Sequence, residues 1–162
     1  MTRIRENMAL RRLKTLHGGD ADLLVDYLHD GGRIGVLVKM TISDPALKDD
    51  AKVKETAFDF ALHVAAFAPS YLSRYKVDPE YISEQEGIFR KQADQMDKPE
   101  KVKEGIAKGK LNKHLAEICL MDQGYIRDEK TKCSQILANL SKELSAEITV
   151  SDFAYFKVGE EI

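Results

Sequence analysis

Residues 23–40, LLVDYLHDGGRIGVLVKM, decide the fold of this chain because they contain its clearest pair of strands. Leu23, Val25 and Tyr27 alternate along one face, as side chains do in a half-buried strand. A DGG turn at residues 30–32 follows, and glycine accepts the positive φ that tight hairpin turns require. The remaining stretch, RIGVLVKM, is rich in branched apolar side chains. The whole segment is therefore predicted to be an antiparallel hairpin.

Further segments are predicted to complete a core around this hairpin. Residues 53–68 carry apolar side chains at helical spacing and end at Pro69, so they should form a helix that covers the sheet. A shorter helix is expected to begin at a Thr131 cap. Residues 148–158 and, more weakly, residues 7–16 have the alternation of strands. This order predicts an α+β domain, with an antiparallel sheet of three to four strands backed by helices on one face.

Between these segments, residues 78–121 are predicted to form a projecting arm, an antiparallel coiled coil of two helices. Asp78 can cap the first helix, Pro79 suits its first position, and the corner DKP at residues 97–99 separates the two helices. Their apolar stripe is too narrow for a broad core and suits a two-helix seam. The expected members of this seam are Ile82, Phe89 and Met96 on the first helix and Val102, Ile106, Leu115 and Ile118 on the second.

Length and charge restrict the classes of function. The chain has 162 residues, which is room for one domain, so residues 1–162 are treated as a single domain with the arm as an excursion. Its net charge is −2, whereas recognition of nucleic-acid phosphates normally requires a basic surplus. No apolar run approaches the roughly 18 to 20 residues needed to span a bilayer, so a cytoplasmic protein is expected.

No catalytic or metal-binding constellation stands out in the sequence. The four histidines form no ligand pair at helical spacing, and none sits beside a cysteine. Cys119 and Cys133 match no zinc spacing and suit a reducing compartment. His63 is interpreted as a hydrogen-bonded core or boundary residue, whereas His29 could equally be structural or in contact with a partner. The chain is expected to be a binding module without cofactor or metal, not an enzyme.

An RNA-binding helical hairpin is the alternative interpretation of the arm. Acidic residues interleave with its lysines, so a solvated helical face is favoured over an RNA site. The lysines are Lys98, Lys101, Lys103, Lys108, Lys110 and Lys113.

Six short stretches carry the pattern of a known family, in the same order along the chain. They are DYLHDGGRIGVLV (26–38), ALHVAA (61–66) with Pro69, KPE (98–100), GKLNK (109–113), EICLMDQ (117–123) and FKVGE (156–160). The chain resembles bacterial elongation factor Ts, the guanine-nucleotide exchange factor for elongation factor Tu, from about Ile4 to Glu161. The corresponding family segments include AMHVAA, GKPE, EGRLNKF, EVCLLEQ and FEVGEG.

The resemblance implies a partner and the residues that contact it. The sheet and helices would form the C-terminal half of the family's core, which grips the third domain of elongation factor Tu in its GDP-bound or nucleotide-free form. His29 and Tyr27, from the motif YxHxGGRIG, would contact this domain. Ile126 and Tyr125, in the loop that the family writes QPFV, would do the same, and Ile4 would approach the GTPase itself. The arm would be the dimerisation module, so a homodimer is possible.

The chain also departs from the family pattern. The family's N-terminal domain and its TDFV motif, which wedges into the GTPase, are absent from the sequence. The pairs Asp59-Phe60 and Asp152-Phe153 are superficially similar to the wedge but are expected inside a helix and the last strand. Gly124 replaces the proline of QPFV, so residues 122–126 are predicted to be an exposed, less rigid loop. The chain is thus expected to be the C-terminal core and dimerisation region, which binds without exchanging nucleotide.

Overall fold

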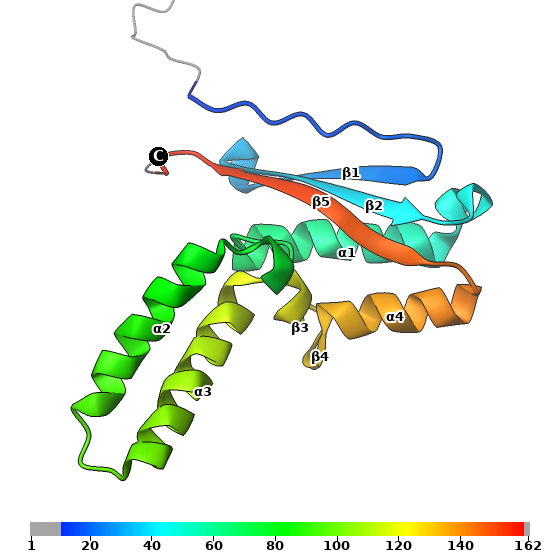
Figure 1. The fold of residues 1–162 in the computed structure, drawn as a ribbon. Coiled ribbons are helices and arrows are strands. Elements are labelled where there is room, and N and C mark those ends of the chain that lie inside the picture. Colours follow the sequence, from blue (N-terminus) through cyan, green and yellow to red (C-terminus); the bar gives the residue numbers. More distant parts are fainter. Residues whose placement is uncertain (1–10, 161–162) are drawn as a thin grey trace, which may run out of the picture.

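A three-stranded antiparallel sheet forms one layer of the computed structural model, which describes residues 11–160 (Figure 1). Its order is β1–β2–β5, where β1 is Asp22–His29, β2 is Ile34–Ile42 and β5 is Ile148–Lys157. The pairing of β1 with β2 confirms the predicted hairpin, and its turn has positive φ at Gly31 and Gly32. β5 pairs with β2 across more than a hundred residues, which closes the core around the segments between them.

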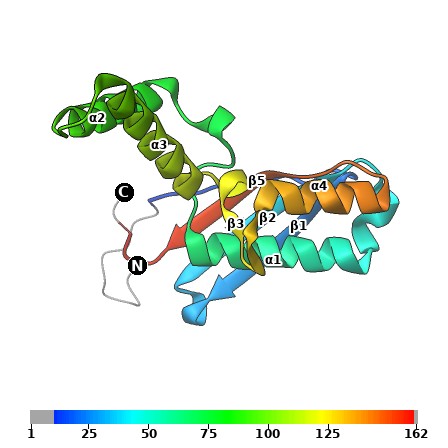
Figure 2. The same ribbon diagram turned by 90° about the horizontal axis from the view of Figure 1, so that it is seen from below.

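Helices cover one face of this sheet. Helix α1 (Ala51–Phe67) and helix α4 (Cys133–Leu144) lie on the same side of it, as Figures 1 and 2 show from two directions. The Asp50 carboxylate caps the N-terminus of α1 by accepting hydrogen bonds from two backbone amides of its first turn. The fully buried side chains between sheet and helices include Val38, Met40, Ile42, Val53, Phe60, Val64 and Ile148. The predicted α+β architecture, a helix-backed antiparallel sheet, is confirmed.

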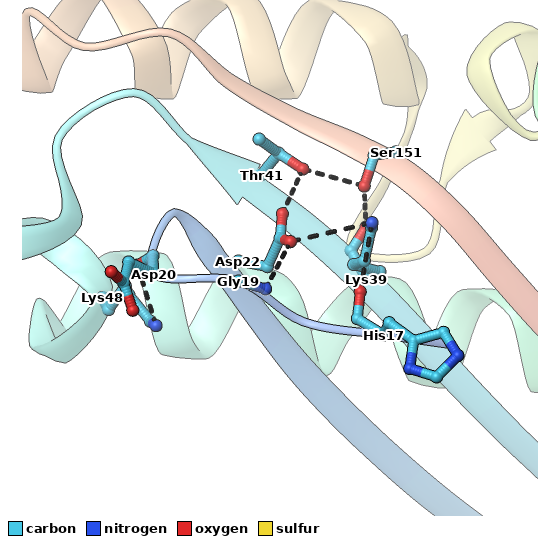
Figure 3. A network of polar contacts seen from close by, with 8 residues as sticks. All are labelled: His17, Gly19, Asp20, Asp22, Lys39, Thr41, Lys48 and Ser151. Carbon is cyan, nitrogen blue, oxygen red and sulfur yellow. Dashed lines mark hydrogen bonds and ion pairs between the residues drawn. The ribbon is translucent and has the colours of Figure 1, made fainter. Parts of the chain in front are cut away.

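The other face of the sheet carries polar side chains and an extended segment. Asp22 of β1 accepts hydrogen bonds from the Gly19 amide (2.9 Å) and the Thr41 hydroxyl (2.7 Å), and these bonds lower the pKa of its carboxyl (Figure 3). The hydroxyls of Thr41 and Ser151 are 2.9 Å apart, so the network reaches all three strands. Lys14, in the extended segment, donates to the β5 backbone.

The strand predicted at residues 7–16 is not present in its described part. Residues 11–19 have no regular secondary structure, and residues 7–10 lie outside the described range. Side-chain contacts such as that between Lys14 and Asp152 (2.7 Å) hold this segment against the sheet. A strand needs a backbone ladder, and alternation of side chains alone does not supply one.

The arm consists of α2 (Pro79–Asp94) and α3 (Glu100–Ile118), which run antiparallel and project from the sheet (Figure 1). The Asp78 carboxylate accepts from the Glu80 amide, which confirms the predicted cap. Small side chains are buried in the outer half of the arm, Ala93 near the end of α2 and Ala107 on α3. Ile82, Phe89, Met96 and Ile106 are half-buried. Val102 is 45% exposed, so its predicted place in the seam is wrong; Ala107 is buried on α3, and a residue five positions earlier points away from that side of the helix.

Backbone and side-chain hydrogen bonds connect the two ends of the arm at its root. The amides of Ser70 and Tyr71 donate to the carbonyl of Ile118 (both 3.0 Å), beside a small cluster of buried apolar residues. Arg74 donates to Asp122 (2.7 Å) and to Asn112 (3.0 Å). These contacts join the segment that enters the arm to the segment that leaves it, so the two ends of the arm are held together at its root.

The segment that follows the arm differs from its prediction. Gln123 and Tyr125 are buried, and β3 (Gly124–Tyr125) pairs with β4 (Asp128–Lys132) in a second small sheet. The loop predicted to be exposed is thus a short hairpin packed on the core. Thr131 lies in β4 and donates to Asp128 (2.6 Å), so it does not cap α4 as predicted. The Thr131 hydroxyl bonds to Asp128 instead of to a backbone amide in the first turn of α4.

Candidate partner-binding surface

Three of the five predicted contact residues line one shallow cavity. Tyr27 and His29 come from β1, and Ile126 comes from the β3–β4 turn nearly a hundred residues later. The cavity has a volume of about 200 Å³. Its remaining lining consists of three apolar side chains of α1, namely Leu62, Ala65 and Ala66. We call these six residues the docking surface.

Tyr27 and His29 form the polar side of the docking surface. Strand alternation places both side chains on the same face of β1, since residues two apart point to the same side of a strand. The Tyr27 hydroxyl lies 3.0 Å from His29 Nδ1, so it can donate to this nitrogen when the histidine is neutral with its proton on Nε2. The Tyr27 ring also packs edge-on against Phe58 of α1 at 5.8 Å. His29 itself is exposed, and these contacts orient its ring toward the cavity.

Ile126 forms the opposite side of the docking surface, and its neighbours hold it there. Tyr125 is 6% exposed, with its ring 5.7 Å from that of Phe60, so it lies beneath the surface and supports Ile126 from inside. The Tyr125 hydroxyl donates to Asp59 (3.0 Å). The pKa of Tyr125 is raised mainly by burial and further by this hydrogen bond. Arg127, on the other side of Ile126, also donates to Asp59 (2.7 Å). Ile4 lies outside the described residues.

A second buried pair holds the beginning of the same segment. His63 Nε2 lies 2.8 Å from the side-chain oxygen of Gln123, and the His63 ring stacks on Phe67 at 4.5 Å. Burial lowers the pKa of His63. The side-chain amide of Gln123 also donates to the Glu117 carbonyl (2.6 Å). The interpretation of His63 as a hydrogen-bonded core residue is confirmed.

Sequence reasoning missed Asp59 and Gln123. One signal for Asp59 was available, because an acidic residue stands among the apolar residues of the helix, four positions before His63. Side chains four apart share one face of a helix, and a buried carboxylate requires partners. Nothing in the local pattern indicates that these partners are Tyr125 and Arg127.

The described residues offer no metal site and no membrane span. Among residues 11–160, no group of three or more histidine, cysteine or acidic side chains is arranged to hold a metal ion. Cys133 Sγ lies 3.7 Å from His63 Nε2, but both groups are buried, and burial raises the pKa of Cys133 to about 12. No helix in this range is both long and apolar enough to cross a membrane.

Comparison with known proteins gives a consistent family. The sequence matches the family model described as Elongation factor TS over residues 1–160. It is 40% identical over 158 residues to elongation factor Ts of Treponema denticola and 41% identical over 157 residues to that of Borrelia hermsii. Elongation factor Ts of Borreliella burgdorferi is 40% identical over 157 residues. These alignments cover 96 to 98% of this chain but 56% of each relative, so the chain spans about half the length of the curated relatives it matches.

Proposed function

Because the chain belongs to the elongation factor Ts family, we propose that it acts in translation elongation by binding elongation factor Tu. The docking surface, which includes Tyr27, His29 and Ile126, contacts the third domain of this GTPase. The observation that carries the proposal is the convergence of two distant segments on one cavity, since both contain positions that the family resemblance assigns to this contact.

The chemistry of the docking surface suits a protein partner. Its floor is apolar, and its polar groups lie at one side, in Tyr27 and His29. Protein interfaces commonly concentrate their binding energy where a side chain enters such a pocket and water is excluded. The third domain would therefore insert an apolar side chain next to Ile126, with a hydrogen-bonding group near His29.

The chain is proposed to bind without accelerating nucleotide release. The family's TDFV wedge is absent from the sequence, and neither Asp-Phe pair replaces it. Asp59-Phe60 is buried in α1, and Asp152-Phe153 lies in β5, where Asp152 accepts from Lys14. Release of labelled GDP from elongation factor Tu should proceed at the same rate with and without the chain. Clear acceleration would contradict this part of the proposal.

Binding to elongation factor Tu in its GDP form is the direct test of the docking surface. The wild-type chain should form a complex, and both His29→Ala and Ile126→Ala should weaken it at least about tenfold if they remove central contacts. Leu28→Ala is the matched control, because Leu28 is exposed and adjacent to His29 but points to the opposite face of β1. The proposal fails if the folded wild-type chain does not bind, or if neither substitution changes the affinity.

We propose in addition that the arm mediates dimerisation through the apolar residues that its own seam leaves accessible. Val102 is exposed, and Ile82, Phe89, Met96 and Ile106 are half-buried. Light scattering should give the mass of a dimer for the wild type and of a monomer for Val102→Lys. Val158→Lys is the control, because Val158 is an exposed valine outside the arm. A wild-type monomer at high concentration would refute this role.

RNA binding by the arm remains the less well supported alternative. Charges of both signs meet on the arm, where Arg90 contacts Asp94, Glu100 and Glu104, and Lys113 contacts Glu117. Paired charges release few counterions, so they contribute little to phosphate binding. An affinity for RNA that falls steeply between two salt concentrations would favour the alternative over the protein partner.

A further inference from the structure

A buried carboxylate ties the β3–β4 turn to helix α1. Asp59 is 4% exposed and lies among apolar side chains of α1, where an unpaired charge would be strongly unfavourable. It accepts from Tyr125 Oη (3.0 Å), from Arg127 Nη2 (2.7 Å) and from Arg127 Nε (3.0 Å). Two nitrogens of one guanidinium thus grip a single carboxylate, the geometry in which arginine binds most strongly and with a defined direction.

The two partners of Asp59 flank Ile126 in the sequence. Tyr125 precedes Ile126 and is held from inside the core, whereas Arg127 follows it and reaches back over the surface. The residues on both sides of Ile126 are therefore hydrogen-bonded, through their side chains, to the same Asp59 carboxylate. The side chain of Ile126, which has no polar contact of its own to fix it, takes its place from these neighbours.

Close packing and local hydrogen bonds define the shape of the turn, so an attachment next to Ile126 can orient it, in addition to the bond between His63 and Gln123 at the start of the segment. Gly124 packs so closely on the backbone of Glu129 that a Cβ at this position would lie 2.4 Å from the Glu129 carbonyl oxygen. Asp128 accepts from the Lys130 amide (3.2 Å) and from the Thr131 hydroxyl (2.6 Å). These contacts stabilise the shape of the turn but do not place it relative to α1.

Asp59 also belongs to the helix that forms the floor of the docking surface. Leu62, Ala65 and Ala66 follow it by one and two turns of α1. The link from Asp59 to Arg127 therefore joins Ile126 to this floor on the side of Ile126 that the contacts of Gln123 and Tyr125 do not reach. Fixing a contact residue before binding reduces the entropy that is lost on association, and so increases affinity.

We propose that Asp59 is a positioning residue that acts through Arg127 and Tyr125 to hold Ile126 in place for elongation factor Tu. This proposal rests on the proposed function of the docking surface. It assigns to Arg127, a largely exposed side chain, an effect on affinity that does not require contact with the partner.

A double-mutant cycle of Arg127→Gln and Ile126→Ala tests the proposal in the full chain, with elongation factor Tu·GDP as the probe. Arg127→Gln alone should weaken binding about tenfold, and in the Ile126→Ala background it should have little further effect. Arg127→Lys should lie between wild type and Arg127→Gln, because lysine keeps the charge but not the two-nitrogen grip. Affinities are measured well below the unfolding temperature of each variant, so that a loss of global stability does not alter them.

Lys130→Gln is the matched control, since it removes a positive charge from the same hairpin, where Lys130 is exposed. Hydrogen exchange of the amides of residues 124–128 should increase in Arg127→Gln and not in Lys130→Gln. An equal loss of affinity from Arg127→Gln in both backgrounds would overturn the proposal, because Arg127 would then contact the partner directly. If Ile126→Ala weakens binding and Arg127→Gln does not, only the positioning role fails. The positioning role also fails if Ile126→Ala alone has no effect, and the docking surface fails with it only if His29→Ala has no effect either.

Discussion

His63 Nε2 and the side-chain oxygen of Gln123 are 2.8 Å apart in the interior, where His63 is fully buried. An amide oxygen only accepts hydrogen bonds, so Nε2 carries the proton and Nδ1 is left without one in the neutral ring. Charging this ring would place a cation in an apolar environment, which is why burial lowers its pKa. The bond joins α1 to the start of the segment that carries Ile126.

This buried histidine predicts a loss of stability in acid. The unfolded chain takes up the proton near pH 6.5, whereas the folded chain resists it to lower pH, so the contribution is complete above 6.5 and is lost as the pH falls below it. The free energy of unfolding should fall by up to about 1.4 kcal/mol per pH unit in this range. Denaturant titrations from pH 7.5 to 5 should show the slope, which His63→Gln should reduce. The exposed His17, changed to glutamine, should leave it intact, and an unchanged slope in His63→Gln would refute the assignment.

The two cysteines should be unreactive in the folded protein. Both are buried, and burial raises the pKa of Cys119 and raises that of Cys133 to about 12. Since the thiolate is the reactive form, Ellman's reagent at pH 8 should titrate no thiol until denaturant is added. Two thiols should then react. Rapid reaction of either cysteine in the native chain would contradict its burial.

Two glycine substitutions should change stability in opposite directions. Gly124→Ala brings a Cβ against the Glu129 carbonyl, so it should destabilise the protein by on the order of 1–3 kcal/mol. Gly87→Ala, in the middle of α2, meets no neighbouring atom within 4 Å and should stabilise the protein by roughly 0.5–1 kcal/mol. Thermal unfolding of both variants measures the difference. Equal stability of the two would show that Gly124 and Glu129 are not packed as described.

The contact between Arg74 and Asp122 should stabilise the root of the arm. Arg74→Met should lower the free energy of unfolding by about 1 kcal/mol, because it removes a partly buried charged hydrogen bond. Hydrogen exchange at residues 118–121 should increase at the same time. Lys54→Met is the control; it removes the more exposed ion pair with Asp49 and should change stability by less than about 0.5 kcal/mol. A larger effect at Lys54 than at Arg74 would argue against a structural role of the root contact.

Local patterns were sufficient for the elements whose signals lie within a few residues. Alternation and a glycine turn predicted the β1–β2 hairpin, and the apolar spacing of residues 53–68 predicted α1. Asp78 and Pro79 marked the start of the arm correctly. The same approach failed at Val102, because sparse apolar residues did not indicate which side of α3 faces α2; the buried residue there is Ala107, on a different side of the helix.

The sequence by itself determined the three strands of the main sheet, helices α1 to α3 and the family, since each depends on short-range spacing or on motifs in order. Only the tertiary structure decided that His29 and Ile126 share one cavity and that Asp59 meets Arg127. These contacts join residues more than sixty positions apart, and a pattern within one helix or strand carries no information about which distant segment will pack against it. Gly124 shows the same limit. The Glu129 backbone leaves no room for a side chain at Gly124, and it approaches Gly124 only in the folded hairpin.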